Sequence, residues 1–432
     1  MDGFTVSLIG FAAILLLAFM RFPLALSMGL VGVIGFGELT NYRAAISNLG
    51  RLVLDLGQSY SLSVLPLFIL MGLLVDKGGM AQQLYRAAYA FLGDKKGGLA
   101  MSTVVACGMF SAISGSSIAT AATMSKVAMP EMRRYRYADS LATASIAAGG
   151  TLGILIPPSV ILVIYGLLTE QSIGKLFMAG FIPGFIGILF YTLAVYFVVT
   201  RNPSLGPAGE RTPWPERLMA LKDVWTTLAL FIFVIGGIYI GLFSATEAAG
   251  MGAAGALLIT FLKGSLKRGV LLEVSREASL LTAKLFALLF GASMFSNFLN
   301  RAGLPDALLG IINYFELSGL AVIFIILIIY ILLGCVFESM SMILLTVPIF
   351  APLVQSLGFD LIWFGILVVV VTEISLITPP IGLNVFVLKG VIKDVSVFTI
   401  FKGVTPFWVV DIFRLALIAF VPALALFLPS MM

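Results

Sequence analysis

The amino-acid sequence predicts an all-α integral membrane protein made of two inverted repeats. Three features predict this fold: an apolar composition, proline pairs that recur 222 residues apart, and arginines concentrated in one copy of the repeat. Of 432 residues, 60% are hydrophobic and 11% are charged, whereas a soluble globular chain has about a quarter charged residues. Apolar stretches long enough to cross a bilayer recur along the chain, beginning at residues 4–20. We therefore expect the function to reside in the membrane.

Two segments with adjacent prolines define the repeat. They are "LGILIPPSVI" at residues 152–161 and "SLITPPIGLN" at residues 375–384. One offset of 222 residues relates four pairs of positions: Pro157 and Pro379, Pro158 and Pro380, Pro130 and Pro352, Ser117 and Ser339. Residues 201–223 are polar and contain four prolines, which is typical of an extended linker. We expect a first repeat at residues 1–200, a cytoplasmic linker at 201–223 and a second repeat at 224–432.

Basic residues indicate that the two repeats have opposite orientations. The loop after Pro130 reads "EMRRYRYAD" and contains three arginines, whereas the equivalent loop after Pro352 reads "LVQSLGFD" and contains none. Lysine and arginine concentrate in cytoplasmic loops, so the first loop is expected inside the cell and its counterpart outside. Arg21 follows the first apolar run, and the same rule places the N-terminus outside.

Each proline pair is expected to break a transmembrane helix, at about 138–170 and at about 361–390. A proline removes a backbone donor and clashes with the preceding turn. Broken helices persist at membrane depth only where they are buried in protein or line a wet cavity. In inverted-repeat transporters they meet near the midplane, where carbonyls hold cations and helix N-termini face anions. The breaks therefore predict an ion or substrate site.

An apolar segment with a polar tip precedes each break. Each such segment predicts a re-entrant hairpin, the first at about 98–130 and the second at about 318–352. In the first copy, "SAISGSSIATAATMS" at residues 111–125 has seven serines and threonines around Gly115. In the second copy, "FESMSMILLTVP" carries Glu338, Ser339 and Ser341. Such hydroxyls can also serve only to bond tightly packed helices together. Their recurrence at one offset, each beside a proline pair, favours a cation site.

Four polar side chains in apolar sequence need an explanation, because such residues are functional candidates by default. Asp411 and Arg414 are three apart on a helix and are expected to neutralise one another. Glu373 either lies near an ion and substrate cavity or pairs with a cation that the sequence does not identify. Asn384, four residues after Pro380, is a candidate polar ligand by position alone.

The sequence also argues against other function classes. It has no histidine, and its two cysteines, Cys107 and Cys335, lie far apart in apolar sequence, so the usual ligands for zinc, copper and haem are missing. We see neither a charge ring typical of an ion channel nor a nucleophile motif of an enzyme. A Walker-type nucleotide loop is also missing, so uphill transport would need an ion gradient.

Four motifs resemble the large membrane (M) subunit of the tripartite ATP-independent periplasmic (TRAP) transporters. They are "PLFILMGLLVDKGGMAQQLY" from Pro66, "SGSSIATAATM" from Ser114, "AAGGTLGILIPPSVILVIYG" from Ala147 and "LITPPIGLNVFVLKG" from Leu376. The resemblance covers essentially the whole chain. It implies an elevator carrier like those of the ion transporter superfamily, in which a domain of two hairpins and two broken helices moves against a scaffold.

The resemblance also implies the site residues. Sodium ligands would lie in two neighbourhoods: Ser114, Gly115, Ser116, Ser117, Gly149, Gly150, Thr151 and Gly153 in the first half, and Glu338, Ser339, Met340, Ser341, Thr378, Pro379 and Gly382 in the second. Substrate-binding residues would be Ser116, Pro157, Pro158, Glu373, Pro380 and Asn384.

The implied function is sodium-driven secondary uptake of an organic acid, a dicarboxylate or a sugar acid, across the bacterial inner membrane. The partners would be a small four-helix membrane (Q) subunit and a periplasmic substrate-binding (P) protein, with the N-terminus in the periplasm. Sodium would be the coupling ion, and no nucleotide, organic cofactor or nucleic acid is expected. A carboxylate carrier that works without a binding protein is the alternative.

Overall fold

The computed structural model describes residues 3–266 and 268–432, and the regular elements in these two ranges are helices. The predicted location of the N-terminus itself falls on residues outside these ranges. The first half contains α1 (Gly3–Phe19), α2 (Leu24–Leu39), α3 (Tyr42–Gln58), α4 (Val64–Lys77), α5 (Met80–Leu92), α6 (Gly98–Ser114), α7 (Ser117–Arg134), α8 (Asp139–Thr151), α9 (Val160–Thr169) and α10 (Ile173–Arg201). Short 3₁₀ turns lie at η1 (Tyr60–Ser63), η2 (Leu152–Ile154) and η3 (Pro203–Leu205).

The second half is also built from helices. It contains α11 (Trp214–Tyr239), α12 (Ala245–Leu262), α13 (Arg268–Arg301), α14 (Leu304–Tyr314), α15 (Gly319–Gly334), α16 (Ser339–Ser356), α17 (Leu361–Ser375), α18 (Leu383–Val391), α19 (Val397–Phe420), α20 (Ala423–Leu426) and the 3₁₀ turn η4 (Pro429–Met431). The starts of α7 and α16 and the starts of α8 and α17 are each separated by the 222 residues seen in the sequence.

The segment between the halves is shorter than the linker expected at residues 201–223. Helix α11 begins at Trp214, and Pro215 lies in its first turn. A proline there costs nothing, because the first backbone N–H groups of a helix have no partner within the helix. Pro213 and Pro215 of the predicted linker therefore lie at the start of α11 and not in an extended chain.

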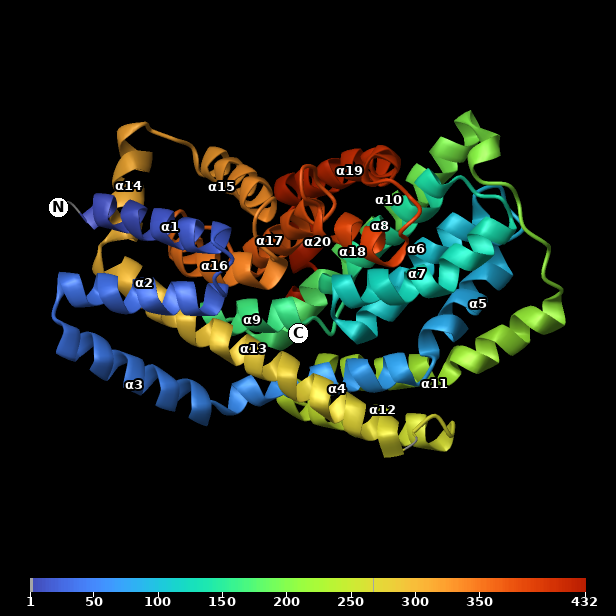
Figure 1. The fold of residues 1–432 in the computed structure, drawn as a ribbon, viewed down its shortest axis with the longest axis horizontal. Helices are drawn as coiled ribbons and strands as arrows, with labels where there is room; N and C mark the ends of the chain where they lie inside the picture. Colours follow the sequence, from blue (N-terminus) through green and yellow to red (C-terminus); the bar gives the residue numbers. More distant parts are fainter. Residues whose placement is uncertain (1–2, 267) are drawn as a thin grey trace.

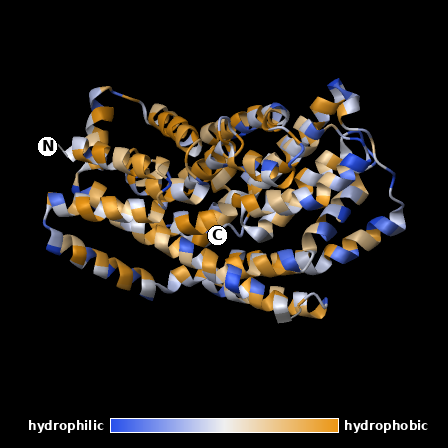
Figure 2. Cartoon of the chain, in the orientation of Figure 1, coloured by the Kyte–Doolittle hydropathy of each residue, from blue (hydrophilic) through white to orange (hydrophobic). Residues whose placement is uncertain are grey.

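Most of the long helices are composed mainly of apolar residues. Within the described residues, seven helices are long and apolar enough to cross a membrane: Tyr60–Lys77, Ile173–Arg201, Trp214–Tyr239, Ala245–Leu262, Gly269–Arg301, Ser339–Ser356 and Val397–Phe420. Figure 2 shows hydrophobic residues along these helices, while hydrophilic residues gather at helix ends and connecting segments. The chain is an all-helical multi-span membrane protein.

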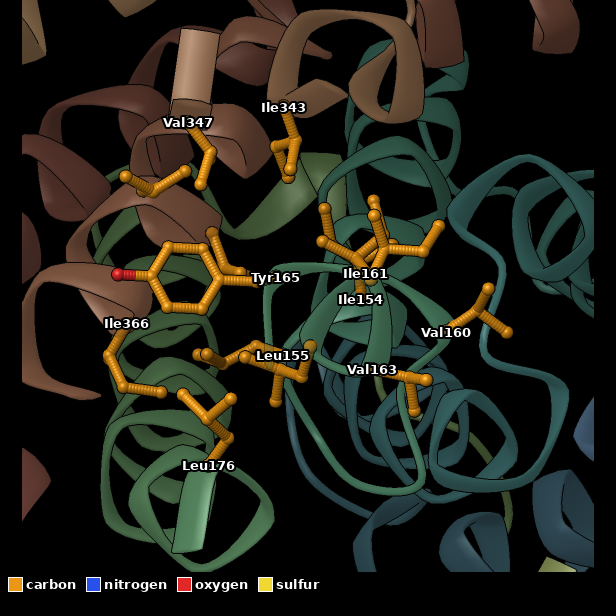
Figure 3. Close-up of a cluster of buried hydrophobic side chains, with 14 of the residues drawn as sticks. Ile154, Leu155, Val160, Ile161, Val163, Tyr165, Leu176, Ile343, Val347 and Ile366 are labelled. Atoms are coloured by element: carbon orange, nitrogen blue, oxygen red, sulfur yellow. The ribbon is translucent and has the colours of Figure 1, made fainter. Parts of the chain in front are cut away.

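The two halves interlock. The long helix α13 of the second half packs against α2 and α4 of the first, and α12 packs against α4 (Figure 1). In addition, α9 packs against α16 and α17, and α18 packs against α7 and α8. Figure 3 shows the contact around α9: its side chains, including Ile161 and Tyr165, meet Ile343, Val347 and Ile366 of the second half. The short helix after each break is thus held by the other half.

Candidate cation sites at two helix breaks

The first hairpin has a sharp tip between α6 and α7. Gly115 ends α6 in the left-handed region with φ of 61°, a conformation that costs glycine little. Ser116 then caps α7, because its side chain accepts a hydrogen bond from the Ala119 N–H. Behind the tip, Ser114 Oγ lies 2.9 Å from Thr120 Oγ1. The tip thus brings hydroxyl and carbonyl oxygens together at the ends of two helices.

The first break lies directly against this tip. Helix α8 ends at Thr151, η2 follows, and α9 starts at Val160 with Ser159 as its cap. A Cβ on Gly153 would lie 2.9 Å from Ser111 Oγ, and a Cβ on Gly150 would lie 3.3 Å from Ser117 O. Glycine at these positions therefore allows the backbone of the break to contact the tip. The tip residues and Gly150 and Gly153 of the first predicted set are therefore brought together. By contrast, a Cβ on Gly149 would lie 2.9 Å from Cys107 Cβ of α6, and Thr151 Oγ1 lies 3.1 Å from the Tyr191 hydroxyl.

The second hairpin tip meets the second break in the same way. Gly334 ends α15, and a Cβ there would lie 2.1 Å from Ser375 Cβ. Cys335 Sγ lies 3.7 Å from the Pro379 carbonyl oxygen. Glu338 is the N-cap residue of α16, and the buried Ser339 and Ser341 follow in its first turn.

Several members of the second predicted set thus occupy one region. Thr378 accepts a hydrogen bond from the Trp408 indole at 2.9 Å, and Gly382 adopts φ of 52° before α18 begins. Met340 is half-buried in the first turn of α16. The tip and the break offer hydroxyl and carbonyl oxygens, and Glu338 adds a carboxylate at the start of α16; these are oxygen ligands that suit a cation.

The two breaks differ in exposure, although they occupy equivalent positions of the sequence repeat. Pro157 and Pro158 are buried, whereas Pro379 and Pro380 are exposed. The first break is covered by α4 and α11: Pro158 and Ala112 share a cavity of about 10 Å³ with side chains of those helices, including Met71 and Phe231. The first break is therefore closed off in this structure, and the second is open.

Glu373 requires a correction as a predicted substrate-binding residue. It is fully buried on α17, and its Oε2 accepts a hydrogen bond from Arg414 Nη2. Arg414 is also 3.0 Å from Asp411 Oδ1, so Asp411 and Arg414 do not simply neutralise one another. The sequence left two interpretations of Glu373 open. The structure supports the one in which Glu373 pairs with a positively charged group, and that group is the Arg414 guanidinium.

Asn384 lies between the halves. Its Nδ2 donates a hydrogen bond to the Ala147 carbonyl oxygen at 3.1 Å, and the side chain is fully buried. Ala147 is two residues before Gly149 of the first predicted sodium set. Asn384 therefore ties α18 to the helix that leads into the first break.

Sequence reasoning missed two side chains that hold these regions in place. Tyr191 of α10 lies 3.1 Å from Thr151 Oγ1 and donates a hydrogen bond to Asp411, and Trp408 of α19 donates to Thr378. Both occur in long apolar helices without a motif around them. The breaks can be recognised in the sequence from their proline pairs. Tyr191 and Trp408 cannot, because their helices become neighbours of the breaks only in the folded chain.

A comparison with protein families shows which family the chain belongs to. Residues 11–424 match the model described as "Tripartite ATP-independent periplasmic transporter, DctM component". The chain belongs to this family. It is a large permease component of a TRAP transporter, and it is not an enzyme.

The relatives of this permease are named for different solutes. The chain is 34% identical over 387 residues to the C4-dicarboxylate TRAP transporter large permease protein DctM of Pseudomonas aeruginosa, covering 89% of this chain and 90% of the relative. It is 31% identical over 420 residues to the ectoine/5-hydroxyectoine large permease UehC of Ruegeria pomeroyi, covering 97% of each. It is 30% identical to the isethionate TRAP transporter permease protein DctMQ of Oleidesulfovibrio alaskensis, covering 94% of this chain and 63% of that longer protein.

The fold of the permease is similar to a solved transporter structure. The YdaH transporter of Alcanivorax borkumensis superposes with a TM-score of 0.61 at 14% identity, over 88% of this chain and 89% of that one. At this identity the similarity concerns the fold alone.

Proposed function

We propose that this permease imports an organic acid, a dicarboxylate or a sugar acid, by sodium symport. The observation that carries the proposal is the meeting of a hairpin tip with a helix break in both halves, each rich in hydroxyl and carbonyl oxygens. Discontinuous helices of transporters use such carbonyl and helix ends to hold coupling cations. Each sodium ion entering with the membrane potential contributes about 2.3 kcal/mol per 100 mV. Two such ions would support accumulation by orders of magnitude, at roughly 1.4 kcal/mol per tenfold ratio.

The proposed movement is that of an elevator. The two hairpins, at about 98–130 and 318–352, and the two broken helices, at about 138–170 and 361–390, would form the moving domain, and the remaining long helices the scaffold. Two inverted repeats would supply the symmetry, and the hairpins would be re-entrant. The unequal exposure of the two breaks supports this, because a carrier stopped at one end of its path covers one break and leaves the other open.

The permease would work with partners. As one component of a tripartite transporter, it is proposed to bind a small four-helix Q subunit and to receive its substrate from a periplasmic P protein. The longer chain of the DctMQ relative supports the pairing with a second membrane subunit. We place the complex in the bacterial inner membrane, with the N-terminus in the periplasm and the segment after α10 in the cytoplasm.

Substrate contacts would come from residues between the tips. Ser116, Pro157, Pro158, Pro380 and Asn384 stay in the proposed set, but Glu373 leaves it because Arg414 occupies its carboxylate. Helix starts near the breaks, at Val160 and Leu383, would favour an anionic group by their dipoles.

Transport by reconstituted protein tests the proposal. Proteoliposomes containing this chain and its Q subunit would take up labelled dicarboxylates or sugar acids only with an inward sodium gradient and the P protein. Uptake that is the same in potassium and sodium would refute sodium coupling. Sodium-driven uptake by the chain alone would support the alternative, a self-sufficient carboxylate carrier.

A further inference from the structure

A cluster of four polar side chains lies buried between the two breaks, and the transport proposal does not use it. Glu373 comes from α17, Asp411 and Arg414 from α19, and Tyr191 from α10, and all four are 0% exposed. Arg414 Nη2 contacts Glu373 Oε2 and lies 3.0 Å from Asp411 Oδ1, and Tyr191 donates a hydrogen bond to Asp411 Oδ2. One guanidinium is therefore shared by two carboxylates.

The charges of this cluster do not balance if both carboxylates are ionised. Two carboxylates and one guanidinium leave one excess negative charge among fully buried groups. An uncompensated buried charge is strongly unfavourable, and ionisable groups in such a place neutralise instead. Two further titratable side chains on helices packed against α17 have other partners: Tyr165 donates to the Leu361 carbonyl oxygen, and Tyr330 accepts from Thr346. They supply no positive charge.

Asp411 has more polar contacts than Glu373 and is therefore better stabilised when ionised. Asp411 Oδ2 accepts from Tyr191, and Oδ1 lies beside the guanidinium. Glu373 Oε2 accepts from Arg414 alone, and neither Glu373 Oε1 nor Asp411 Oδ1 has a hydrogen-bond partner. Asp411 thus contacts both a hydroxyl donor and the guanidinium, whereas Glu373 contacts the guanidinium only. The guanidinium packs closely against α10 at Gly187, where a Cβ would lie 2.0 Å from Arg414 Nη1. This packing leaves no room for a hydrated metal ion at that side of the guanidinium, but a proton needs none.

We propose that Glu373, Asp411, Arg414 and Tyr191 form a buried binding site for a single proton, held by the two carboxylates together and residing mainly on Glu373. The proton makes the cluster neutral. Through Tyr191 the neutral cluster reaches Thr151 at the end of α8, and through Glu373 it reaches the end of α17. It therefore joins the helix ends that lead into both breaks without leaving a net charge inside the membrane.

Infrared difference spectroscopy of the purified chain at neutral pH tests this directly, because a protonated carboxyl has a C=O stretching band that a carboxylate lacks. Glu373→Gln removes the group that carries the proton, so the wild-type band disappears. Asp411→Asn removes the other negative charge, so Arg414 alone balances Glu373 and the proton leaves. We expect both variants to lose the same band, whereas Glu216→Gln, at an exposed carboxylate of α11, retains it.

Two results would overturn the proposal. If the wild-type spectrum minus that of Glu373→Gln shows no carboxylic-acid band, Glu373 is ionised in the folded chain. If Asp411→Asn retains the full band, the proton is not set by the charge balance of the cluster. Both substitutions preserve size, so the variants are suited to folding in the wild-type packing. The measurement needs no transport, so failure of sodium-driven uptake would leave this result unaffected.

Discussion

Single side chains of α19 support the second break, and Trp408 is the clearest example. Its indole donates to Thr378 Oγ1, so it fixes a hydroxyl in the second proposed sodium site. Trp408→Phe should raise the sodium concentration needed for half-maximal uptake several-fold while leaving the amount of folded protein unchanged. Trp363→Phe is the matched control, because that indole donates to Ile418 O away from the break. An unchanged sodium dependence in Trp408→Phe would contradict a role for Thr378.

Gly334 is required for close contact between the second tip and α17. Its missing side chain leaves space for Ser375, whose Cβ would otherwise lie 2.1 Å away. Gly334→Ala should lower stability by about 1–3 kcal/mol, the usual range for overpacking a tight interior site. The measurement is thermal unfolding of the purified protein. Gly310→Ala in α14, where nothing lies within 4 Å, should be neutral or stabilising by up to about 1 kcal/mol, and equal losses in both would contradict the packing argument.

At the scale of helices, the sequence predicts the positions of the breaks well, because proline acts locally. Helices α8 and α17 end at Thr151 and Ser375, a few residues before each proline pair, as expected for residues that cannot continue a helix. The start of α11 was missed because proline is also compatible with the first turn of a helix. The partner of Glu373 was missed for a different reason: Arg414 reaches it only after α17 and α19 pack, and no local pattern specifies that contact.

A contact between the last turn of α7 and the segment before α19 should depend on pH. Arg133 contacts Asp139 and, at 2.6 Å, Asp394 in the segment before α19. The hydrogen bond from Arg133 lowers the pKa of Asp394 below its usual range. A lowered pKa in the folded state means that the contribution to stability is present above the ordinary aspartate pKa of about 3.9 and is lost as the pH falls through the lowered value.

Thermal unfolding of wild type and Asp394→Asn checks this dependence. The wild type should unfold at a higher temperature at neutral pH, and the gap should close in acid. Asp55→Asn, at an exposed carboxylate of α3, serves as the control and should show no gap at either pH. A gap for Asp394→Asn that persists in acid would rule out the ion pair as its cause.

At the scale of the whole molecule, inverted repeats require that equivalent loops face opposite sides of the membrane. Arg134 and Ser356 are 222 residues apart and both are exposed at the ends of α7 and α16. With Cys107 and Cys335 replaced by alanine, Arg134→Cys should be labelled by a membrane-impermeant thiol reagent only from the cytoplasmic side, and Ser356→Cys only from the periplasmic side. Labelling of both from one side would mean parallel repeats.

The central claim is that the junctions of hairpin tips and helix breaks bind sodium, and thermal unfolding in sodium versus potassium tests it most directly. A ligand that binds only the folded state stabilises it by an amount that grows with its concentration, about 2.7 kcal/mol at 100 times Kd. We predict a higher Tm in sodium chloride than in potassium chloride at equal ionic strength, with a smaller difference in Ser114→Ala and in Trp408→Phe. The same Tm in both salts at every concentration would contradict the account.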